Sequence, residues 1–212
     1  ITRGLSAIDD SIPILSEEGE LPMYSERSSW LKYWLIDPLD GTKEFIKKSD
    51  QFTINIALMI NNFPFFGVVY CPVLDDLYWG LSSNKAYKIK KDKKTIPIQI
   101  NTDISKSVNV AISRSHPSSK MDIFLSQFKK FDLFPIGSSL KICSVADGTV
   151  DLYPRLGPTM EWDTAAAHAI IRGSGGDLIK VGSSDTIIYN KENLLNPEFI
   201  AGDYKFIETL KH

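Results

Sequence analysis

Residues 37–45 read Asp-Pro-Leu-Asp-Gly-Thr-Lys-Glu-Phe, and no other stretch restricts the fold and the chemistry of this chain as strongly. They directly follow the apolar run 33–36, Tyr-Trp-Leu-Ile, which is typical of a buried strand. Two carboxylates, Asp37 and Asp40, therefore leave the end of that strand together, followed at once by a turn glycine and a hydroxyl. We interpret this arrangement as one part of an acidic metal site.

The spacing of the two acids is the physical reason for this interpretation. A strand that ends at Asp37 and turns at Pro38 brings Asp40 back towards the same point, and two nearby carboxylates repel each other unless a cation lies between them. Oxygen ligands of this kind suit Mg²⁺, which is commonly held by a few carboxylates together with a substrate phosphate. Gly41 and Thr42 add backbone N–H groups that attract an anion if a helix begins there. The alternative is that these residues only end a strand and form an ordinary turn.

A third carboxylate stands in the segment 161–171, Glu-Trp-Asp-Thr-Ala-Ala-Ala-His-Ala-Ile-Ile, which predicts an alanine-rich helix with Asp163 as its N-cap. Capping alone explains an Asp at that place. A capping carboxylate still has a second oxygen for a metal, so the two interpretations are compatible. A fourth acidic feature is Glu17 next to Glu18, after the short strand-like run 12–16; adjacent acids at a strand end are also typical of solvated surface charge.

Taken together, segments 16–18, 34–42 and 162–166 resemble the inositol monophosphatase superfamily of Mg²⁺-dependent, Li⁺-sensitive phosphatases. The resemblance implies an α/β fold, the layered αβαβα sandwich of the inositol monophosphatase and fructose-1,6-bisphosphatase type. It implies two or three Mg²⁺ ions, with Li⁺ as an inhibitor, and a phosphate that is received by Gly41 and Thr42, with the Thr42 hydroxyl orienting the attacking water. The metal ligands implied by the resemblance are Glu17, Asp37, Asp40, Asp163 and the main-chain carbonyl of Leu39. The catalytic residues that it implies are Asp37, Asp40, Thr42 and Glu17.

Four further segments, 43–46, 112–116, 137–141 and 152–155, resemble the CysQ-type 3′(2′),5′-bisphosphate nucleotidases within that superfamily. These phosphoric monoester hydrolases convert adenosine 3′,5′-bisphosphate to AMP and phosphate. The resemblance also leaves open the sulfated precursor PAPS as a substrate, and it implies a role in sulfur assimilation. The substrate-binding residues that it implies are Glu17, Leu39, Asp40, Gly41, Thr42, Ser113, His116, Gly137, Ser138, Lys141, Arg155 and Asp163.

The chemistry of three of these residues agrees with a nucleotide bisphosphate. Its second phosphate needs cationic or N–H partners away from the metal, and Lys141, Arg155 and His116 can supply them. The alternatives stay open at this point: 113–116 could be a plain loop after a strand, 137–139 a helix start capped by serine, and Arg155 a surface arginine.

Two other functions are compatible with the sequence. One is a related phosphatase that acts on inositol monophosphate or another sugar phosphate. The other is an inactive relative that serves as a binding or regulatory module. The intact acidic set argues against the second, because an inactive relative is free to lose such ligands.

One family motif has no counterpart here. Relatives carry an Asp-x-x-x-Thr-x-Ala-Asp type motif before the segment that matches 16–18, and its first Asp works with the threonine that corresponds to Thr42. The acids before Glu17 are Asp9 and Asp10, which lie too close to it in sequence. Because the chain begins at Ile1, we expect that an N-terminal segment of a longer protein is missing and that it contains the acid partner of Thr42.

Composition restricts the partners and the location. A formal charge of −2 on 212 residues gives no polyanion-binding character, so we expect a small-molecule substrate and no nucleic acid polymer. No apolar stretch is long enough to predict a transmembrane helix. Cys71 and Cys143 both lie in apolar surroundings and suit a reducing cytoplasm, where we place the protein. Peripheral association with the inner membrane stays open, as does the choice between monomer and homodimer.

The predicted secondary-structure pattern changes near residue 105, which divides the chain into two halves. Residues 1–105 predict an antiparallel sheet with a helix before residue 12, and residues 106–212 alternate strands and helices, which is typical of a layered α/β unit. The first half supplies Glu17, Asp37 and Asp40, and the second supplies Asp163 and the nucleotide contacts, so we expect the site in the cleft between them. In the second half we predict helices over 118–130, 138–147 and 163–173, and strands over 108–113, 133–136, 149–154 and 177–181.

Overall fold

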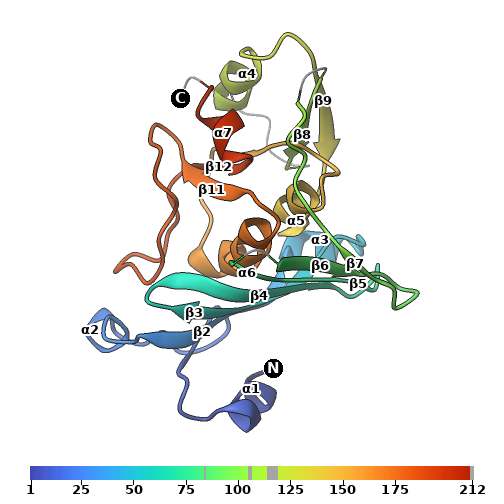
Figure 1. The fold of residues 1–212 in the computed structure, drawn as a ribbon. Coiled ribbons are helices and arrows are strands. Elements are labelled where there is room, and N and C mark those ends of the chain that lie inside the picture. Colours follow the sequence, from blue (N-terminus) through green and yellow to red (C-terminus); the bar gives the residue numbers. More distant parts are fainter. Residues whose placement is uncertain (84, 105–106, 114–118, 211–212) are drawn as a thin grey trace.

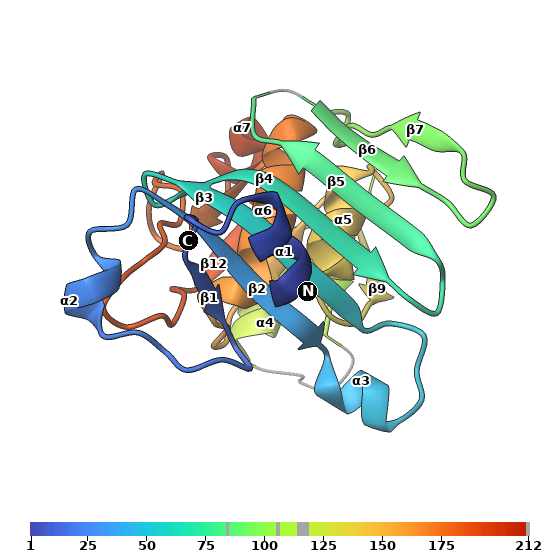
Figure 2. The same ribbon diagram turned by 90° about the horizontal axis from the view of Figure 1, so that it is seen from below.

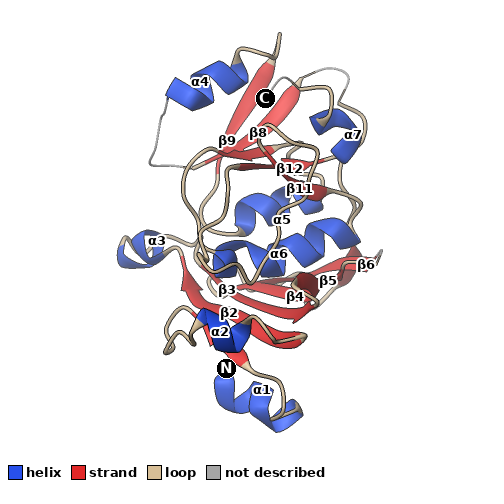
Figure 3. Cartoon of the chain, turned by 90° about the vertical axis from the view of Figure 1, so that its left-hand side faces the viewer, coloured by secondary structure: helices blue, strands red, loops and turns tan. Residues whose placement is uncertain are grey.

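The fold consists of five alternating layers of helices and strands (Figures 1 and 3). The computed structural model describes residues 1–83, 85–104, 107–113 and 119–210. From one end to the other, the layers are α1 (Thr2–Ile8), a seven-stranded sheet, the helix pair α5 (Leu140–Ala146) and α6 (Glu161–Gly173), two small sheets, and finally α4 (Ser119–Leu125) with α7 (Tyr204–Ile207). This order agrees with the predicted α/β fold, an αβαβα sandwich.

The large sheet contains seven strands in their sequence order. Only β1 and β2 pair in parallel, and every other neighbouring pair is antiparallel, so the predicted antiparallel sheet is confirmed apart from its first strand. Asn61 and Asn62 form the turn between β3 and β4 with φ values of 51° and 60°, a left-handed conformation that asparagine tolerates. The strands are β1 (Ile14–Ser16), β2 (Lys32–Asp40), β3 (Thr53–Ile60), β4 (Phe63–Cys71), β5 (Asp76–Leu81), β6 (Lys85–Ile89) and β7 (Thr95–Pro97).

Helix α6 lies directly on one face of this sheet, and small residues on both sides allow the close approach. Its alanines at 165, 166, 167 and 169 are fully buried. On the strand side, a Cβ added to Gly67 of β4 would lie 2.1 Å from the carbonyl oxygen of Ala166, and one added to Gly80 of β5 would lie 2.8 Å from Cα of Ile170. The backbones of helix and sheet therefore touch, which fixes the height of α6 above the sheet.

The opposite face of the sheet carries α1 (Figure 2). Leu5 of α1 and Ile12 are buried together with Trp34 and Ile36 of β2 in a small apolar cluster. The remaining short helices are α2 (Tyr24–Arg27) and α3 (Thr42–Ile46), and α3 follows β2 directly.

The two small sheets lie beyond α5 and α6. One has the antiparallel order β10 (Tyr153–Arg155), β12 (Phe199–Gly202), β11 (Asp177–Lys180), and the other pairs β8 (Val108–Ile112) with β9 (Phe131–Pro135) in parallel. The largest buried cluster contains residues of the large sheet, such as Tyr33 and Met59, as well as Ile142 and Phe199 from the second half. The site is therefore held between parts of the chain that share one core.

Several predicted boundaries in the second half need correction. Helix 138–147 runs from Leu140 to Ala146, and strand 133–136 runs from Phe131 to Pro135. Helix α4 ends at Leu125 instead of 130, because residues 126–130 form the turn that leads into β9, whose first residue, Phe131, pairs with Val108. Strand 149–154 is reduced to Tyr153–Arg155, which pairs with β12. Helix α6 begins at Glu161 instead of 163. The predicted start of the helix at 118 and the proposed division at residues 105–106 lie outside the described residues.

None of the helices in the described part of the chain has the length and apolar character needed to cross a membrane.

Candidate metal and phosphate site

Three carboxylates meet at the end of β2. Ligand oxygens of Asp37, Asp40 and Asp163 all lie within 4.8 Å of one another. Asp37 is almost fully buried, and the other two are half-buried. This group, which we call the acidic trio, joins the two segments that the sequence singled out.

A bulge explains how Asp37 and Asp40 reach the same side of β2. In a regular strand, residues three apart point to opposite faces. Here Asp37 pairs with Asn55 and Asp40 pairs with Thr53, so the β2 strand has one more residue than β3 over this stretch. Such a bulge re-aims the side chain, and it brings both carboxylates to the same point.

Asp163 does not cap α6 in the predicted manner. The N-cap is Met160, and Asp163 is the third helical residue. One of its oxygens, Oδ2, accepts a hydrogen bond from the Met160 backbone N–H at 2.8 Å. The side chain therefore folds back onto the start of the helix and leaves its second oxygen for the trio.

Electrostatics make the acidic trio a strong candidate for a cation. Burial first, and then the charge of Asp40, raise the pKa of Asp37 to about 9. The same two causes, burial and then Asp40, raise the pKa of Asp163 to about 7. No described Lys, Arg or His forms an ion pair with a member of the trio, so no ion pair offsets the repulsion between the carboxylates. Three hard oxygen donors that need a positive charge fit a divalent ion such as Mg²⁺.

One oxygen of Asp40 is saturated with hydrogen bonds. Asp40 Oδ2 accepts from Ser138 Oγ at 2.5 Å, from Ser139 N at 2.6 Å and from Ser139 Oγ at 2.8 Å. Asn55 Nδ2 lies 3.4 Å from the same oxygen and also donates to Ser139 Oγ at 2.9 Å. Thr53 Oγ1 shares a hydrogen bond of 2.5 Å with Ser138 Oγ. These partners fix the Asp40 carboxylate so that its other oxygen is free for a ligand.

Ser139→Ala is expected to weaken metal binding by about 10- to 100-fold, the usual effect of losing a hydrogen-bond partner of a metal ligand. Ser139 is buried, and its hydroxyl also lies 2.6 Å from the Asp163 carbonyl oxygen. Calorimetric titration of Mg²⁺ into the metal-free protein measures the affinity. Ser184→Ala, at an exposed position, provides the control, and equal affinities in the two variants would contradict the role of Ser139.

Glu17, Leu39 and Thr42 lie around the trio without joining it. Glu17 is exposed, but its charge contributes to the raised pKa of both Asp37 and Asp163. The Leu39 N–H donates to Asp37 Oδ1 at 2.9 Å. Gly41 has φ 88°, which favours glycine, and Thr42 begins α3 with an exposed side chain. The predicted helix start at Thr42 is therefore present.

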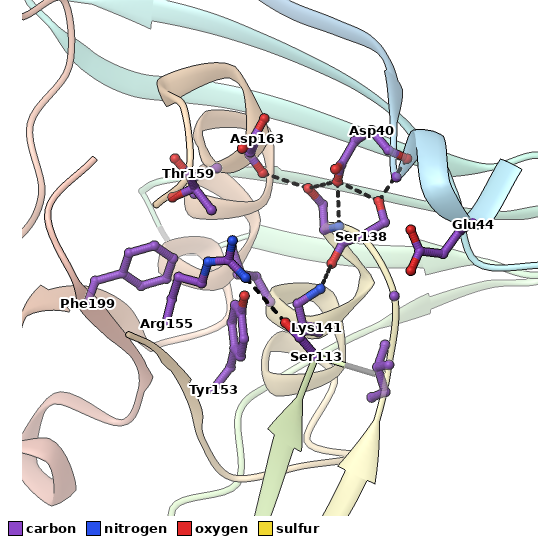
Figure 4. A pocket seen from close by; sticks show the side chains of 16 residues that line it. Asp40, Glu44, Ser113, Ser138, Lys141, Tyr153, Arg155, Thr159, Asp163 and Phe199 are labelled. Atoms are coloured by element: carbon purple, nitrogen blue, oxygen red, sulfur yellow. Dashed lines mark hydrogen bonds between the residues drawn. The ribbon is translucent and has the colours of Figure 1, made fainter. Parts of the chain in front are cut away.

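A pocket beside the trio collects most of the predicted nucleotide contacts (Figure 4). His116 lies outside the described residues. Glu17, Asp37, Leu39 and Thr42 do not line this pocket. The predicted residues that do line it are Asp40, Gly41, Ser113, Gly137, Ser138, Lys141, Arg155 and Asp163.

The two cations of the pocket are held by different contacts. Lys141 Nζ donates to the Ser138 carbonyl oxygen at 2.7 Å and lies 5.3 Å from the centre of the Tyr153 ring. Burial lowers the pKa of Lys141 to about 8, although the charge of Asp40 opposes this shift. Arg155 donates to Ser113 Oγ at 3.2 Å and to two backbone carbonyls. Both side chains are thus held in place before any ligand binds.

Sequence reasoning missed the residues that hold the trio. Thr53 and Asn55 are buried polar residues on the same face of β3 as the apolar Ala57 and Met59. The sequence signal that could have identified them is the presence of polar residues on the inward face of a strand that pairs with the acidic segment. Glu161 was also missed: it is fully buried, forms an ion pair with Lys191 Nζ, and accepts from the Asn190 N–H at 2.6 Å, which anchors the start of α6.

Known proteins match this chain in sequence and in architecture. The profile of the inositol monophosphatase family matches residues 1–210. The 3′(2′),5′-bisphosphate nucleotidase CysQ of Salmonella typhimurium is 44% identical over 200 residues, which are 94% of this chain and 79% of that protein. Its namesake in Shigella flexneri is 41% identical over 204 residues, 96% of this chain and 81% of that protein.

Solved structures agree. The crystal structure of CysQ from Bacteroides thetaiotaomicron, described as a bacterial member of the inositol monophosphatase family, has a TM-score of 0.87 at 38% identity and covers 96% of this chain and 82% of that one. The SaIMPase-II structure with bound inositol monophosphate shares the fold, with a TM-score of 0.74 at 21% identity over 98% of this chain and 79% of that one. The whole described architecture is therefore that of one family. This chain belongs to the inositol monophosphatase family.

Proposed function

We propose that this chain is a Mg²⁺-dependent 3′(2′),5′-bisphosphate nucleotidase that hydrolyses adenosine 3′,5′-bisphosphate to AMP and phosphate. One observation carries the proposal: the pocket that contains Asp40 and Asp163 also contains two cations, Lys141 and Arg155. A phosphate at the acidic end needs a metal, whereas a second phosphate needs cationic side chains. The names of the relatives at 41–44% identity support the same substrate class.

The metal ligands that we propose are those expected from the sequence. Asp37, Asp40 and Asp163 form the trio, and Glu17 and the Leu39 carbonyl complete the proposed set. From the family resemblance we propose two or three ions and inhibition by Li⁺. When bound, Mg²⁺ lowers the pKa of a water molecule and stabilises charge on the phosphoryl and leaving oxygens.

The protein's own residues position the reactants. Gly41 and Thr42 receive the phosphate that is removed, and the exposed Thr42 hydroxyl orients the attacking water. Ser138 and Ser139 hold Asp40, which assigns Ser138 a supporting role in addition to the substrate contact proposed for it. Lys141 and Arg155, with Ser113 beside the arginine, bind the 5′-phosphate. Because both phosphates are held, the ester bond is presented in one orientation.

Lys141→Ala is expected to raise KM for adenosine 3′,5′-bisphosphate by about tenfold, the effect of one charged hydrogen bond, and to change KM for 3′-AMP much less. Steady-state kinetics with both nucleotides measure the difference. Circular dichroism of the variant is the necessary control, because Lys141 is buried and packs on Tyr153. An equal effect on both nucleotides would remove Lys141 from the 5′-phosphate site.

Phosphate release from three substrates tests the function itself. Adenosine 3′,5′-bisphosphate, inositol 1-phosphate and fructose 1,6-bisphosphate are assayed separately with Mg²⁺ and again after chelation. We expect the highest kcat/KM for the nucleotide and no release without metal. Faster turnover of either sugar phosphate would favour the alternative phosphatase. PAPS extends the series, and its hydrolysis would support the proposed role in sulfur assimilation.

The cellular location is also a proposal. Cys71 and Cys143 are both free and fully buried. Buried unpaired thiols suit a reducing compartment, so we propose the cytoplasm.

A further inference from the structure

Glu44 lines the substrate pocket but has no part in the machinery described above. It lies on α3, three residues after Gly41, and is half-buried. A Cβ added to Gly137 would lie 3.1 Å from Glu44 Cγ, so the side chain packs against the far wall of the pocket. Figure 4 shows its carboxylate near Ser138, across the pocket from Arg155.

The Glu44 carboxylate has no hydrogen bond and no ion pair with any described residue. Its charge acts on Lys141 only through space. An ionised carboxylate accepts hydrogen bonds and cannot donate, so it repels phosphate groups and is satisfied only by a donor. The Glu44 carboxylate is therefore available to accept a hydrogen bond from a donor on the ligand.

The position of Glu44 identifies that donor. In the proposed function the phosphate that is removed lies at Gly41 and Thr42, which are one helical turn or less from Glu44 along the chain. In a nucleoside 3′(2′),5′-bisphosphate, the hydroxyl on the ribose carbon next to the reactive ester is the donor nearest to that phosphate. Donors on the base lie farther away, beyond the ribose.

We propose that Glu44 is a specificity-determining residue that accepts a hydrogen bond from this neighbouring ribose hydroxyl. The inference rests on the proposed function. The same acceptor serves both regioisomers, because a 3′-phosphate leaves the 2′-hydroxyl free and a 2′-phosphate leaves the 3′-hydroxyl free. Glu44 thus selects a ribonucleotide, while Lys141 and Arg155 select its second phosphate.

Matched substrates test the proposal without interference from charge. Adenosine 3′,5′-bisphosphate and its 2′-deoxy form carry the same charge, so a general electrostatic effect of Glu44 cancels in the ratio of their kcat/KM values. We expect the wild-type protein to prefer the ribonucleotide by about tenfold, the factor for one hydrogen bond to a charged group. In Glu44→Ala the ratio is expected to fall to about one, mainly through loss of activity on the ribonucleotide. Glu44→Gln, which keeps an acceptor oxygen, is expected to retain part of the preference.

Glu20→Ala is the control, because Glu20 is exposed and lies outside the pocket lining. A wild-type ratio near one, or an unchanged ratio in Glu44→Ala, would overturn the role of Glu44 while leaving the nucleotidase function intact. A changed Mg²⁺ requirement in Glu44→Ala would also overturn it, since that result assigns Glu44 to the metal. If the wild-type protein hydrolyses neither nucleotide, the proposed function fails and this inference fails with it.

Discussion

Asp40→Asn is expected to reduce kcat/KM for adenosine 3′,5′-bisphosphate by about a thousandfold or more, because metal stabilisation of the reaction contributes several kcal/mol. The substitution removes one charge from the trio, and the carboxylate that loses it is the one with the most ordered partners. The fold is expected to tolerate the change. An Asn oxygen can still accept from Ser139, while its amide faces the carboxylates of Asp37 and Asp163.

Two measurements on this variant separate activity from folding. Phosphate release gives the catalytic loss, and the midpoint of thermal unfolding without metal gives the stability. The midpoint is expected to stay the same or rise, because the charge of Asp40 raises the pKa of both Asp37 and Asp163 in the native protein. Asp122→Asn, at an exposed position of α4, is the control. Unchanged Mg²⁺-dependent activity in Asp40→Asn would refute the metal assignment.

Gly67→Ala is expected to have the largest effect on stability, with a loss of about 3 kcal/mol or more, the upper range for overpacking a core. The added Cβ would lie 2.1 Å from the Ala166 carbonyl oxygen and 2.8 Å from its carbon, and both are backbone atoms that cannot rotate away. Helix α6 must therefore move off the sheet. That movement also displaces Asp163, so activity is expected to fall together with stability.

Urea unfolding of Gly67→Ala measures this loss. Gly4→Ala is the matched control, because a Cβ at Gly4 has nothing within 4 Å and Gly4 lies inside α1, where alanine is the better helix former. The control is expected to be neutral or slightly stabilising. If Gly67→Ala is as stable as the wild-type protein, the close contact between α6 and β4 is wrong.

The sequence predicted the acids of the site but not the way they are held. Asp37 and Asp40 were expected to converge because of the turn that follows them. Their convergence actually depends on a bulge against β3, which is a property of strand pairing and is not encoded within residues 37–40 alone. Asp163 lies in the trio and lines the pocket, but it is the third helical residue and not the predicted N-cap.

The supporting residues could not be predicted because their partners are far away in sequence. Ser139 lies 99 residues from Asp40, and Arg27 lies 163 residues from Asn190, whose side chain it contacts. Boundaries failed for a similar reason: α4 stops early because residues 126–130 turn the chain towards β9, which pairs with β8 from Phe131 on, and such tertiary constraints override local helix propensity. The predictions were correct for elements with a strong local sequence pattern, such as the hairpin turn at Asn61 and Asn62.

A competition between two substrates tests the central claim most directly. Equimolar adenosine 3′,5′-bisphosphate and inositol 1-phosphate are mixed with the protein and Mg²⁺, and ³¹P NMR follows both until half of one is consumed. The ratio of the initial rates equals the ratio of the kcat/KM values. We predict that the nucleotide is consumed first and that 5′-AMP is the product, since Lys141 and Arg155 retain the 5′-phosphate. Faster loss of inositol 1-phosphate, or 3′-AMP as the product, would contradict the account.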